Sequence, residues 1–413
     1  MFTNRMIRNL LVPVVLEQIL NSIMGTADTM MVSNVGSAAL SAVSLVDSIN
    51  VLLIQAFSAL AAGGAIVCAQ YIGQRNYEKA NMSARQVLFI ITAISVVVSA
   101  VCLIFQKPLL RLIFGAVDAD VMRASEIYFF FTALSFPFIA AYDSAASIFR
   151  AQENTKGPMT ISMISNIMNI GGNAVLIWVF HLGVAGAAIS TLVSRIFCAI
   201  VVIWQLRNPA EQIYVRNYFS IRPDWSLIKR VLFIGIPSGI ENSMFQFGKL
   251  AIQSTVSTLG TVAIAAQAMT SILEALNGIA AMGVGIGLMT VVGQCIGAKR
   301  KDEAIYYIKR LSWLSEIVIL ISCAVVYLLA KPVTILGGME AESARLCLQM
   351  VAFITITKPI SWVLSFIPAY GMRAAGDVKF SMITSCASMW LCRVSLCIFL
   401  CRFCDFGPIA VWI

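Results

Sequence analysis

Residues 10–32 read LLVPVVLEQILNSIMGTADTMMV, an apolar run that is interrupted by Glu17, Asn21 and Asp28. A helix needs about 20 predominantly apolar residues to cross the roughly 30 Å hydrocarbon core of a bilayer. The run therefore predicts a membrane-spanning helix. Its carboxylate and amide groups are costly at membrane depth, and such groups normally face a cavity or a partner.

Apolar runs of this kind recur along the whole chain of 413 residues. Charged residues make up only 12% of the sequence, against about 25% in a typical soluble domain. Eleven full spans are predicted, at 10–33, 44–70, 86–106, 121–149, 157–180, 185–206, 229–256, 267–295, 310–330, 345–372 and 379–402. A twelfth begins near Gly407, and the sequence ends at Ile413. We therefore expect an all-α integral membrane protein on a twelve-helix plan, with the last helix truncated in this chain.

The chain also matches itself when it is displaced by 224 residues, and again at 223 residues after one small insertion or deletion. The matched pairs include Pro13 with Pro237, Glu17 with Glu241, Gln70-Tyr-Ile-Gly73 with Gln294-Cys-Ile-Gly297, and Arg150-Ala151 with Arg373-Ala374. Each copy holds six spans, so both copies cross the membrane in the same sense, and such folds bind substrate between their halves. We predict two pseudo-symmetric six-helix bundles: an N-terminal lobe over 1–206, a cytoplasmic linker over 207–228 and a C-terminal lobe over 229–413.

The distribution of basic residues predicts the orientation. With the N-terminus in the cytoplasm, 19 of the 29 Lys and Arg residues flank the spans on the inside and six flank them on the outside. Because cytoplasmic loops of membrane proteins are enriched in Lys and Arg, we expect a multi-pass protein of the cell membrane with its N-terminus inside. The same rule explains the net charge of +9 without a nucleic-acid partner.

Polar residues on the first and fifth spans form one candidate site. Glu17, Asn21 and Asp28 fall on one stripe of the first helix, while Asn169 and Asn173 share a face of the fifth. Carboxylate and amide oxygens are the hard ligands that suit Na⁺, and they can equally tune the proton affinity of a carboxylate. We predict a cation-coupling site at Asp28, Asn169 and Asn173, with helix–helix hydrogen bonding as the alternative role of the amides.

The second half carries its own deep charges, Glu241, Lys249 and Glu274. Together with Glu17 and Asn21 they are predicted to line a substrate or proton cleft. The alternative is that Lys249 neutralises Glu274 or Glu241 in a buried pair. The sequence has no Gly-rich phosphate loop, no Ser/His/Asp set and no zinc spacing. We therefore expect no enzyme activity, no cofactor beyond a coupling ion, and energy from an ion gradient.

These features resemble the multidrug and toxic compound extrusion (MATE) family. The resemblance rests on the duplicated unit, Pro-x-x-x-Glu at spans one and seven, Ala-Asp-Thr-Met-Met-Val over 27–32, the Gln-x-Ile-Gly loops, and Arg-Ala-Ala-Gly-Asp-Val-Lys over 373–379. It implies two six-helix bundles around a central cleft and export of organic cations driven by Na⁺ or H⁺. It also implies that Asp28 is the coupling acid, with Asn169 and Asn173 beside it and Glu241 in the second lobe. One branch of the family has an aspartate where this chain has Asn173.

Three functions follow as hypotheses. The first is an antiporter, acting as a monomer, that exports cationic amphipathic small molecules in exchange for Na⁺ or H⁺, because an acidic cleft with apolar walls favours lipophilic cations. The second is a flippase for a lipid-linked anionic glycan precursor, which would need a basic cleft. The third is a non-transporting receptor or scaffold, which would not need buried carboxylates in both lobes. The choice between Na⁺ and H⁺ and the identity of the substrate stay open.

Overall fold

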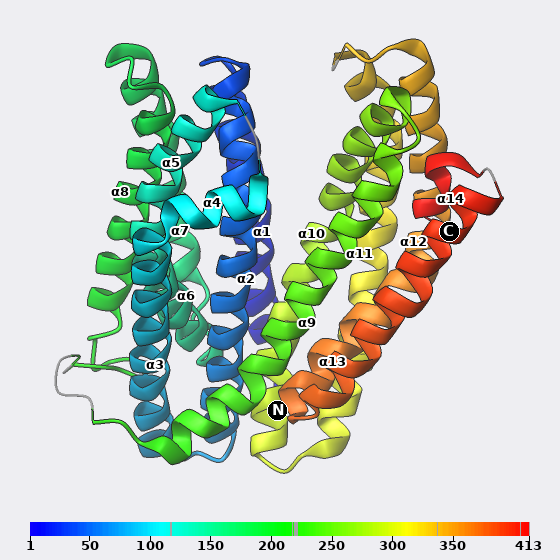
Figure 1. The fold of residues 1–413 in the computed structure, drawn as a ribbon. Coiled ribbons are helices and arrows are strands. Elements are labelled where there is room, and N and C mark those ends of the chain that lie inside the picture. Colours follow the sequence, from blue (N-terminus) through cyan, green and yellow to red (C-terminus); the bar gives the residue numbers. More distant parts are fainter. Residues whose placement is uncertain (116–117, 217, 219–221, 337, 405, 413) are drawn as a thin grey trace. The chain divides into compact units, whose positions relative to one another are not determined.

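The structure is a computed structural model that describes residues 1–115, 118–216, 218, 222–336, 338–404 and 406–412 (Figure 1). These residues form helices, most of them joined by short loops, with a longer connection between Gln205 and Trp225. The helices group into two compact units, Met1–Gly239 with Gly293–Lys299, and Ile240–Val292 with Arg300–Ile413. This division falls within two long helices, whereas the predicted lobes are divided by the loop 207–228, of which residues 217 and 219–221 lie outside the described residues.

The first unit holds the helices of the first half of the sequence. Their bounds are α1 (Asn4–Ser33), α2 (Ser37–Gly73), α3 (Tyr77–Ile104), α4 (Gln106–Phe114), α5 (Ala119–Leu134), α6 (Phe136–Ala151), α7 (Lys156–Asn173), the π-helix η1 (Ala174–Val179) and α8 (Gly183–Gln205). The short helix α4 was not predicted from the hydropathy. The start of α9 (Trp225–Ser257) and the end of α10 (Thr261–Gly297) also belong to this unit.

The second unit holds the rest of α9 and α10 and the remaining helices. These are α11 (Lys301–Leu336), α12 (Ala341–Ala375), α13 (Val378–Ala387), the π-helix η3 (Ser388–Val394), α14 (Ser395–Phe403) and the 3-10 helix η4 (Gly407–Val411). The predicted twelfth helix thus appears as the short turn η4, and Ile413 lies outside the described residues.

Among the described residues, nine helices are long and apolar enough to cross a membrane, or ten when the bent pair α5 and α6 counts as one span. The predicted span 121–149 is this pair, which bends by 42°, with Pro137 in the first turn of α6. A proline there is expected because its missing N–H is not needed at a helix start. The predicted span 229–256 lies on α9, a helix of 33 residues that is not among the nine. The all-helical membrane fold predicted from the sequence is confirmed.

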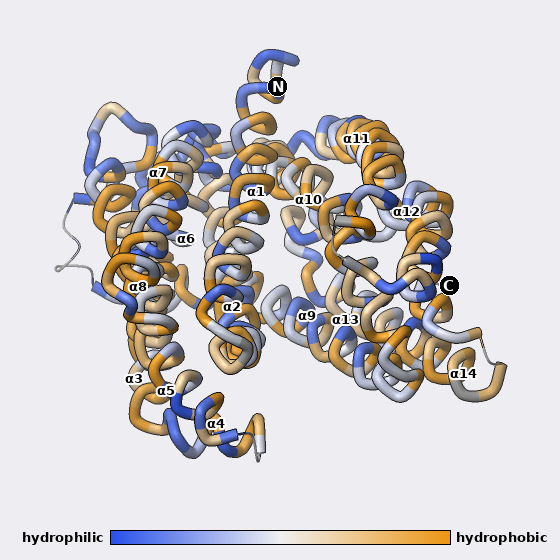
Figure 2. The backbone as a smooth tube through the Cα atoms, turned by 90° about the horizontal axis from the view of Figure 1, so that it is seen from above, coloured by the Kyte–Doolittle hydropathy of each residue, from blue (hydrophilic) through white to orange (hydrophobic). Residues whose placement is uncertain are grey.

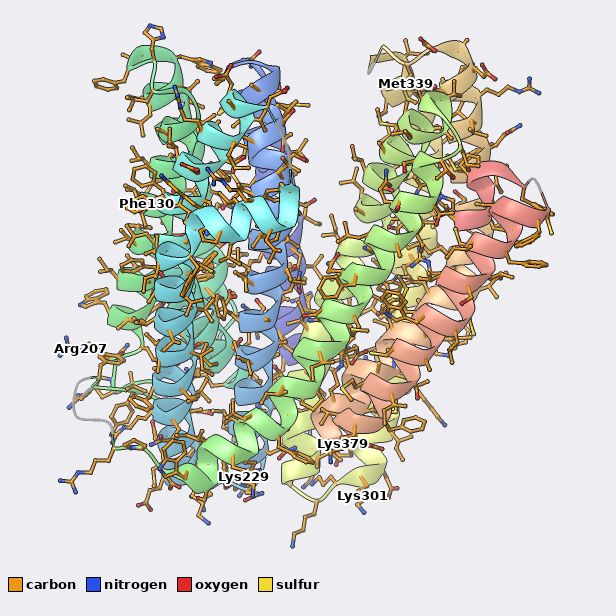
Figure 3. The ribbon with its side chains drawn as sticks, in the orientation of Figure 1. Phe130, Arg207, Lys229, Lys301, Met339 and Lys379 are labelled. Atoms are coloured by element: carbon orange, nitrogen blue, oxygen red, sulfur yellow. The ribbon has the colours of Figure 1, made fainter. Side chains whose placement is uncertain are left out.

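Hydrophobic residues run along the helices (Figure 2). Leu328, Leu364 and Leu391 are each more than 70% exposed, at 72%, 73% and 75%. Exposed apolar surface on this scale is a liability in water, but it suits contact with lipid tails. Lys301 and Lys379 lie at one end of the second unit and Met339 at the other (Figure 3).

Close approach of helix backbones shapes the core of the first unit. A Cβ atom on Gly63 of α2 would lie 2.7 Å from the backbone nitrogen of Gly235 on α9. Small residues allow helices in membranes to pack backbone to backbone. Just ahead of this crossing, Asp224 caps α9 by accepting hydrogen bonds from the Ser226 hydroxyl at 2.6 Å and from its backbone N–H at 3.0 Å. These hydrogen bonds hold the pKa of Asp224 below its usual value.

Candidate cation-binding site

The predicted residues Asp28, Asn169 and Asn173 come together inside the first unit. The Asn173 side-chain amide donates to Asp28 Oδ1 at 2.7 Å and to Asn169 Oδ1 at 3.2 Å. The Asn169 amide in turn donates to the Thr191 hydroxyl at 3.2 Å. The cluster therefore draws Asp28 from α1, two amides from α7 and a hydroxyl from α8.

Tight packing between α7 and α8 holds the amides in place. The Ser190 hydroxyl donates to the backbone carbonyl of Asn169 at 2.8 Å. A Cβ atom on Gly172 would lie 2.4 Å from Ser190 Oγ, so the glycine lets the two helices approach. Directly after Asn173 the helix continues as the π-helix η1, and short π-helical segments inside α-helices are frequent at functional sites.

The cluster has the chemistry of a small-cation site. Asn173 Oδ1 is buried and has no hydrogen-bond partner among the described residues. No Lys or Arg in the part of the chain that the structure describes lies within ion-pair distance of Asp28. An orphaned buried acceptor is unusual in proteins, and a carboxylate with nearby amide and hydroxyl oxygens suits a hard cation or a proton. Within the same described residues, no group of three or more His, Cys, Asp or Glu side chains is placed to hold a metal ion.

The two glutamates that match in the sequence repeat are each paired with the matched arginine. Glu17 lies 3.9 Å from Arg150 and accepts a hydrogen bond from the Tyr142 hydroxyl at 3.1 Å. In the second unit, Glu241 lies 2.7 Å from Arg373. The equivalent pairing in both halves favours a structural role for these two acids over a role in a substrate or proton cleft.

Glu274 is also paired, but with a different partner from the one predicted. Lys358 Nζ lies 2.6 Å from Glu274 Oε1 and donates to the Glu274 backbone carbonyl at 2.9 Å. Lys249, the alternative partner, forms no ion pair with Glu274 or Glu241 among the described residues, where Lys358 and Arg373 hold those positions. Lys249 lies over the Phe245 ring at 5.3 Å and interacts with Glu274 electrostatically.

The polar stripe on α1 faces α7 as expected. Asn21 Oδ1 accepts hydrogen bonds from the Ser162 hydroxyl at 2.9 Å and from the Asn166 amide at 3.0 Å. These contacts are helix–helix hydrogen bonds between neutral groups. Asn21 therefore joins α1 to α7 about two helical turns before Asp28.

A second polar network lies close to Asp28. It was not predicted from the sequence. Asp47 on α2 accepts hydrogen bonds from Asn50 at 3.1 Å and from the Tyr128 hydroxyl at 3.2 Å. Arg195 on α8 donates to the Ser135 hydroxyl at 2.7 Å and interacts electrostatically with Asp28 and Asp47. The sequence signal that could have located this helix face, and Thr191 with it, is the polar run ISTLVSR over 189–195 inside an apolar span.

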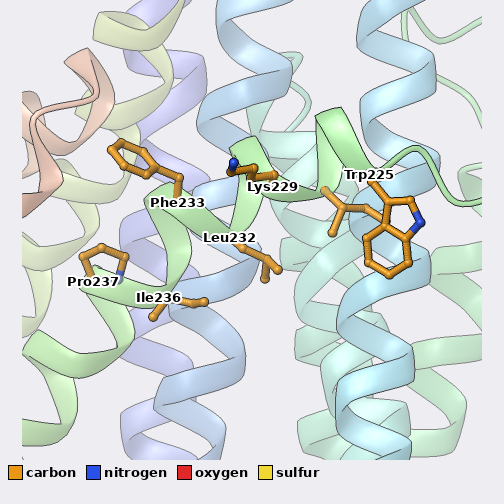
Figure 4. Close-up of a pocket in the computed structure, with 7 residues that line it drawn as sticks. Trp225, Lys229, Leu232, Phe233, Ile236 and Pro237 are labelled. Atoms are coloured by element: carbon orange, nitrogen blue, oxygen red, sulfur yellow. The ribbon is translucent and has the colours of Figure 1, made fainter.

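A hollow on α9 does not belong to this site. Its lining residues all lie on this helix, from Trp225 to Pro237, and they include the charged Lys229 (Figure 4). None of the predicted site residues lines it.

The membrane-spanning helices define the class of this protein, a multi-pass membrane protein, and the polar cluster around Asp28 lies within them. The family model MatE matches residues 13–175 and 237–399, one match in each half. The chain therefore belongs to the MATE family of multidrug efflux transporters, and the two matches confirm the duplication seen in the sequence.

Individual relatives agree with this assignment. The chain is 26% identical over 407 residues to the uncharacterized transporter YisQ of Bacillus subtilis, covering 97% of this chain and 88% of the relative. It is 22% identical to the probable multidrug resistance protein NorM of Thermotoga maritima, covering 98% and 87%.

Solved structures share the fold. A crystal structure of MATE in complex with MaL6 has a TM-score of 0.93 at 18% identity, covering 99% of this chain and 91% of that one. A MOP superfamily transporter from Pyrococcus furiosus, described as having a binding pocket of reverse polarity, has a TM-score of 0.92 at 17% identity, covering 99% and 90%. At these identities the likeness concerns the fold alone.

Proposed function

We propose that this protein is a secondary active antiporter that exports amphipathic organic cations in exchange for Na⁺ or H⁺. The observation that carries the proposal is the state of Asp28. Of the four deep acids predicted from the sequence, Asp28 alone has no Lys or Arg at ion-pair distance among the described residues, and it lies in a cluster of amide and hydroxyl oxygens. An unpaired carboxylate at membrane depth is a functional site by default.

In this mechanism the coupling cation binds at Asp28 and neutralises it. The carboxylate, Asn173 Oδ1 and the Thr191 hydroxyl supply oxygen ligands for Na⁺, or the carboxylate takes a proton. Because neutral and charged Asp28 stabilise different arrangements of the helices around it, cation binding shifts the population between outward-open and inward-open states. Coupling then requires that cation and substrate bind the two states with different affinities.

Reconstitution in proteoliposomes tests the proposal. We would impose Na⁺ and pH gradients separately and follow the movement of ethidium by its fluorescence. Movement driven by at least one gradient is expected, and it should vanish in Asp28→Asn. The matched control is Asp118→Asn, which makes the same change at an exposed position ahead of α5. No movement with either gradient, or unchanged movement in Asp28→Asn, would overturn the proposal.

We further propose that the N-terminus and the loop 207–228 lie in the cytoplasm, that the lobes comprise 1–206 and 229–413, and that the transporter acts as a monomer in the cell membrane. As a transporter of this family, the protein is not an enzyme.

The flippase hypothesis is the second candidate, and one observation favours it. The acids Glu17, Glu241 and Glu274 each form an ion pair with a basic residue. Their negative charges are therefore balanced, and they do not make a cleft strongly acidic. The MATE-like fold does not fix the polarity of the pocket, given the description of the Pyrococcus furiosus transporter. A flippase would translocate a fluorescent anionic lipid between leaflets without an ion gradient, whereas the antiporter requires the gradient.

A further inference from the structure

Four charged side chains form one cluster in the second unit, which we name the basic cluster: Lys249 on α9, Glu274 on α10, Lys358 on α12 and Arg393 in the π-helix η3. Glu274 interacts electrostatically with all three basic residues, and Lys249 also interacts with Lys358 and Arg393. The cluster therefore contains three positive charges and one negative charge within long apolar helices.

The negative charge of Glu274 is balanced by one of the three basic residues. Lys358, which is only 5% exposed, lies 2.6 Å from Glu274 and forms an ion pair with it. In the described part of the chain no carboxylate lies within ion-pair distance of Lys249 or Arg393. A net positive charge thus remains on two residues, Lys249 and Arg393.

Lys249 and Arg393 lie over aromatic rings rather than within ion-pair distance of a carboxylate among the described residues. Lys249 Nζ lies 5.3 Å from the Phe245 ring centre, and the Arg393 guanidinium lies 6.0 Å from the same ring and 5.9 Å from the Trp412 ring. A ring attracts a cation only weakly compared with a carboxylate, and two cations that share one ring repel each other. The arrangement leaves the positive charges in place without neutralising them.

Snorkelling to the membrane surface does not account for these charges. Lys249 lies eight residues before the end of α9 at Ser257, a distance of about 12 Å at the rise of an α-helix. Arg393 lies ten residues before the end of α14 at Phe403, or about 15 Å. Both distances exceed the length of a lysine or arginine side chain, so neither charge reaches the end of its helix. Lys249 is exposed and Arg393 is partly exposed, so both are accessible to a ligand.

The side chains around the basic cluster offer aromatic surface to the apolar part of a ligand. Phe245 packs edge-on against Phe366 with ring centres 5.8 Å apart, and Phe366 stacks on Trp362 at 4.9 Å. Gly278 presents no side chain to Trp362 or to Lys358, whose Nζ would lie 3.4 Å from a Cβ atom at this glycine.

A buried polar atom lies on the same helix as the acid of the cluster. Asn277 comes three residues after Glu274 on α10, and residues at this spacing are neighbours on a helix surface. The side-chain carbonyl oxygen of Asn277 is buried and has no hydrogen-bond partner among the described residues. Because orphaned buried acceptors are rare, this atom indicates that the polar interactions around the cluster are incomplete.

We propose that the basic cluster is a subsite for the anionic group of an amphipathic small molecule, such as an aryl carboxylate. Lys249 and Arg393 bind the anionic group, and the rings of Phe245 and Trp362 contact the apolar body. Charge-assisted hydrogen bonds from Lys and Arg to carboxylates are among the strongest in proteins. The position of Arg393 inside η3 agrees with this role, because π-helical segments are frequent at functional sites.

The subsite extends the range of substrates beyond organic cations. It rests on the proposed function in one respect, namely that its ligand is a transported molecule. The same chemistry occurs in the headgroup of an anionic phospholipid. Binding to the purified protein in detergent needs neither an ion gradient nor Asp28. Failure of this proposal therefore leaves the ethidium experiment untouched, and failure of that experiment leaves this one untouched.

Calorimetry with a matched set of probes tests the subsite: 2-naphthoate, the neutral 2-naphthamide, and a naphthyl trimethylammonium salt. We expect the full chain to bind 2-naphthoate about tenfold or more tightly than either other probe. Lys249→Gln and Arg393→Gln should each remove this preference, while Lys249→Arg keeps it because the charge stays. The control is Arg216→Gln, which removes another cation that lies over an aromatic ring, at 5.6 Å from Tyr214.

Any of three results would overturn the proposal. The first is equal binding of the three probes, and the second is an unchanged preference for 2-naphthoate in both glutamine variants while they remain folded in size-exclusion chromatography. The third is loss of the preference in Arg216→Gln. Adding phosphatidylglycerol distinguishes the sources of the anion. Competition that depends on Lys249 assigns the subsite to lipid headgroups, and no competition assigns it to free small molecules.

Discussion

Asp28 Oδ1 accepts a hydrogen bond of 2.7 Å from the Asn173 amide, and the carbonyl oxygen of that same amide is buried without a partner among the described residues. The Asn173 amide nitrogen thus donates to the carboxylate, while the amide oxygen accepts no hydrogen bond from the described residues. Rotation of the amide by half a turn would exchange the two atoms, because an asparagine side chain is nearly symmetric in shape. Asn173 can therefore support Asp28 as an anion, and it can also offer an oxygen to a cation bound there.

Replacement of Asn173 by alanine should abolish or strongly reduce cation-driven export, because the cluster loses both the hydrogen bond to Asp28 and an oxygen ligand. The measurement is gradient-driven ethidium movement in proteoliposomes. The control is Asn166→Ala on the same helix, since the Asn166 amide donates to Asn21 rather than to Asp28. Equal loss in both variants would mean that any polar deletion on α7 disables the protein, and the specific role of Asn173 would be rejected.

The sequence predicted the helices well, because hydropathy and span length are local properties. It also predicted that Glu17, Asn21 and Asp28 share a stripe, and the structure places hydrogen-bond partners for all three on α6 or α7. What it could not predict was the pairing of charges. Glu274 and Lys358 are 84 residues apart in sequence, and no periodicity links positions on different helices.

The sequence repeat also duplicates a pair of opposite charges. Glu17 matches Glu241 and Arg150 matches Arg373 at nearly the same displacement. The structure pairs each glutamate with the arginine of its own half. Two acids and two bases that are duplicated together are expected to form ion pairs with each other, and this signal could have distinguished the paired acids from Asp28.

Removal of one partner of the Glu241–Arg373 pair should destabilise the second unit. Their side chains are 8% and 15% exposed at a separation of 2.7 Å, so Glu241→Gln leaves a nearly buried guanidinium unpaired, at a cost of about 3 kcal/mol. The melting temperature in detergent should fall, and adding Arg373→Met should restore part of it. The more exposed pair Arg300–Glu303, whose side chains are 55% and 33% exposed at a separation of 2.8 Å, provides the control, since Glu303→Gln should lower the melting temperature less. A smaller effect for Glu241→Gln than for Glu303→Gln would contradict the structural role.

The proposed orientation predicts which loops react with a thiol reagent that cannot cross the membrane. We would introduce Cys at Asn208 or at Asp118, both exposed, in a chain whose exposed Cys392 and Cys404 are replaced by Ser. In intact cells Asp118→Cys should be labelled and Asn208→Cys should be protected until the membrane is permeabilised. The reverse pattern would place the N-terminus outside and would reject the orientation drawn from the positive charges.

The repeated Gln-x-Ile-Gly motifs predict a matched pair of destabilising variants. A Cβ atom on Gly73 would lie 2.0 Å from the backbone oxygen of Gln294, and a Cβ atom on Gly297 would lie 2.0 Å from the backbone oxygen of Gln70. The end of α2 and the end of α10 thus touch through the same residues of the two copies, within the first unit. The glycines are needed because a backbone carbonyl, unlike a flexible side chain, cannot move aside cheaply.

Alanine at either glycine should therefore lower the free energy of unfolding. The loss should be at least as large as that for overpacking a close-packed core, which is roughly 1–3 kcal/mol. Gly25→Ala on α1 is the control, because nothing lies within 4 Å of a Cβ atom there, and the better helix propensity of alanine should stabilise by up to about 1 kcal/mol. The two effects have opposite signs, so thermal unfolding in detergent separates them clearly. If Gly73→Ala and Gly297→Ala melted at or above the temperature of the parent chain, the two motifs would not pack backbone to backbone. Unequal effects at the two glycines would instead mean that only one side of the contact is rigid, since the geometry is the same at both.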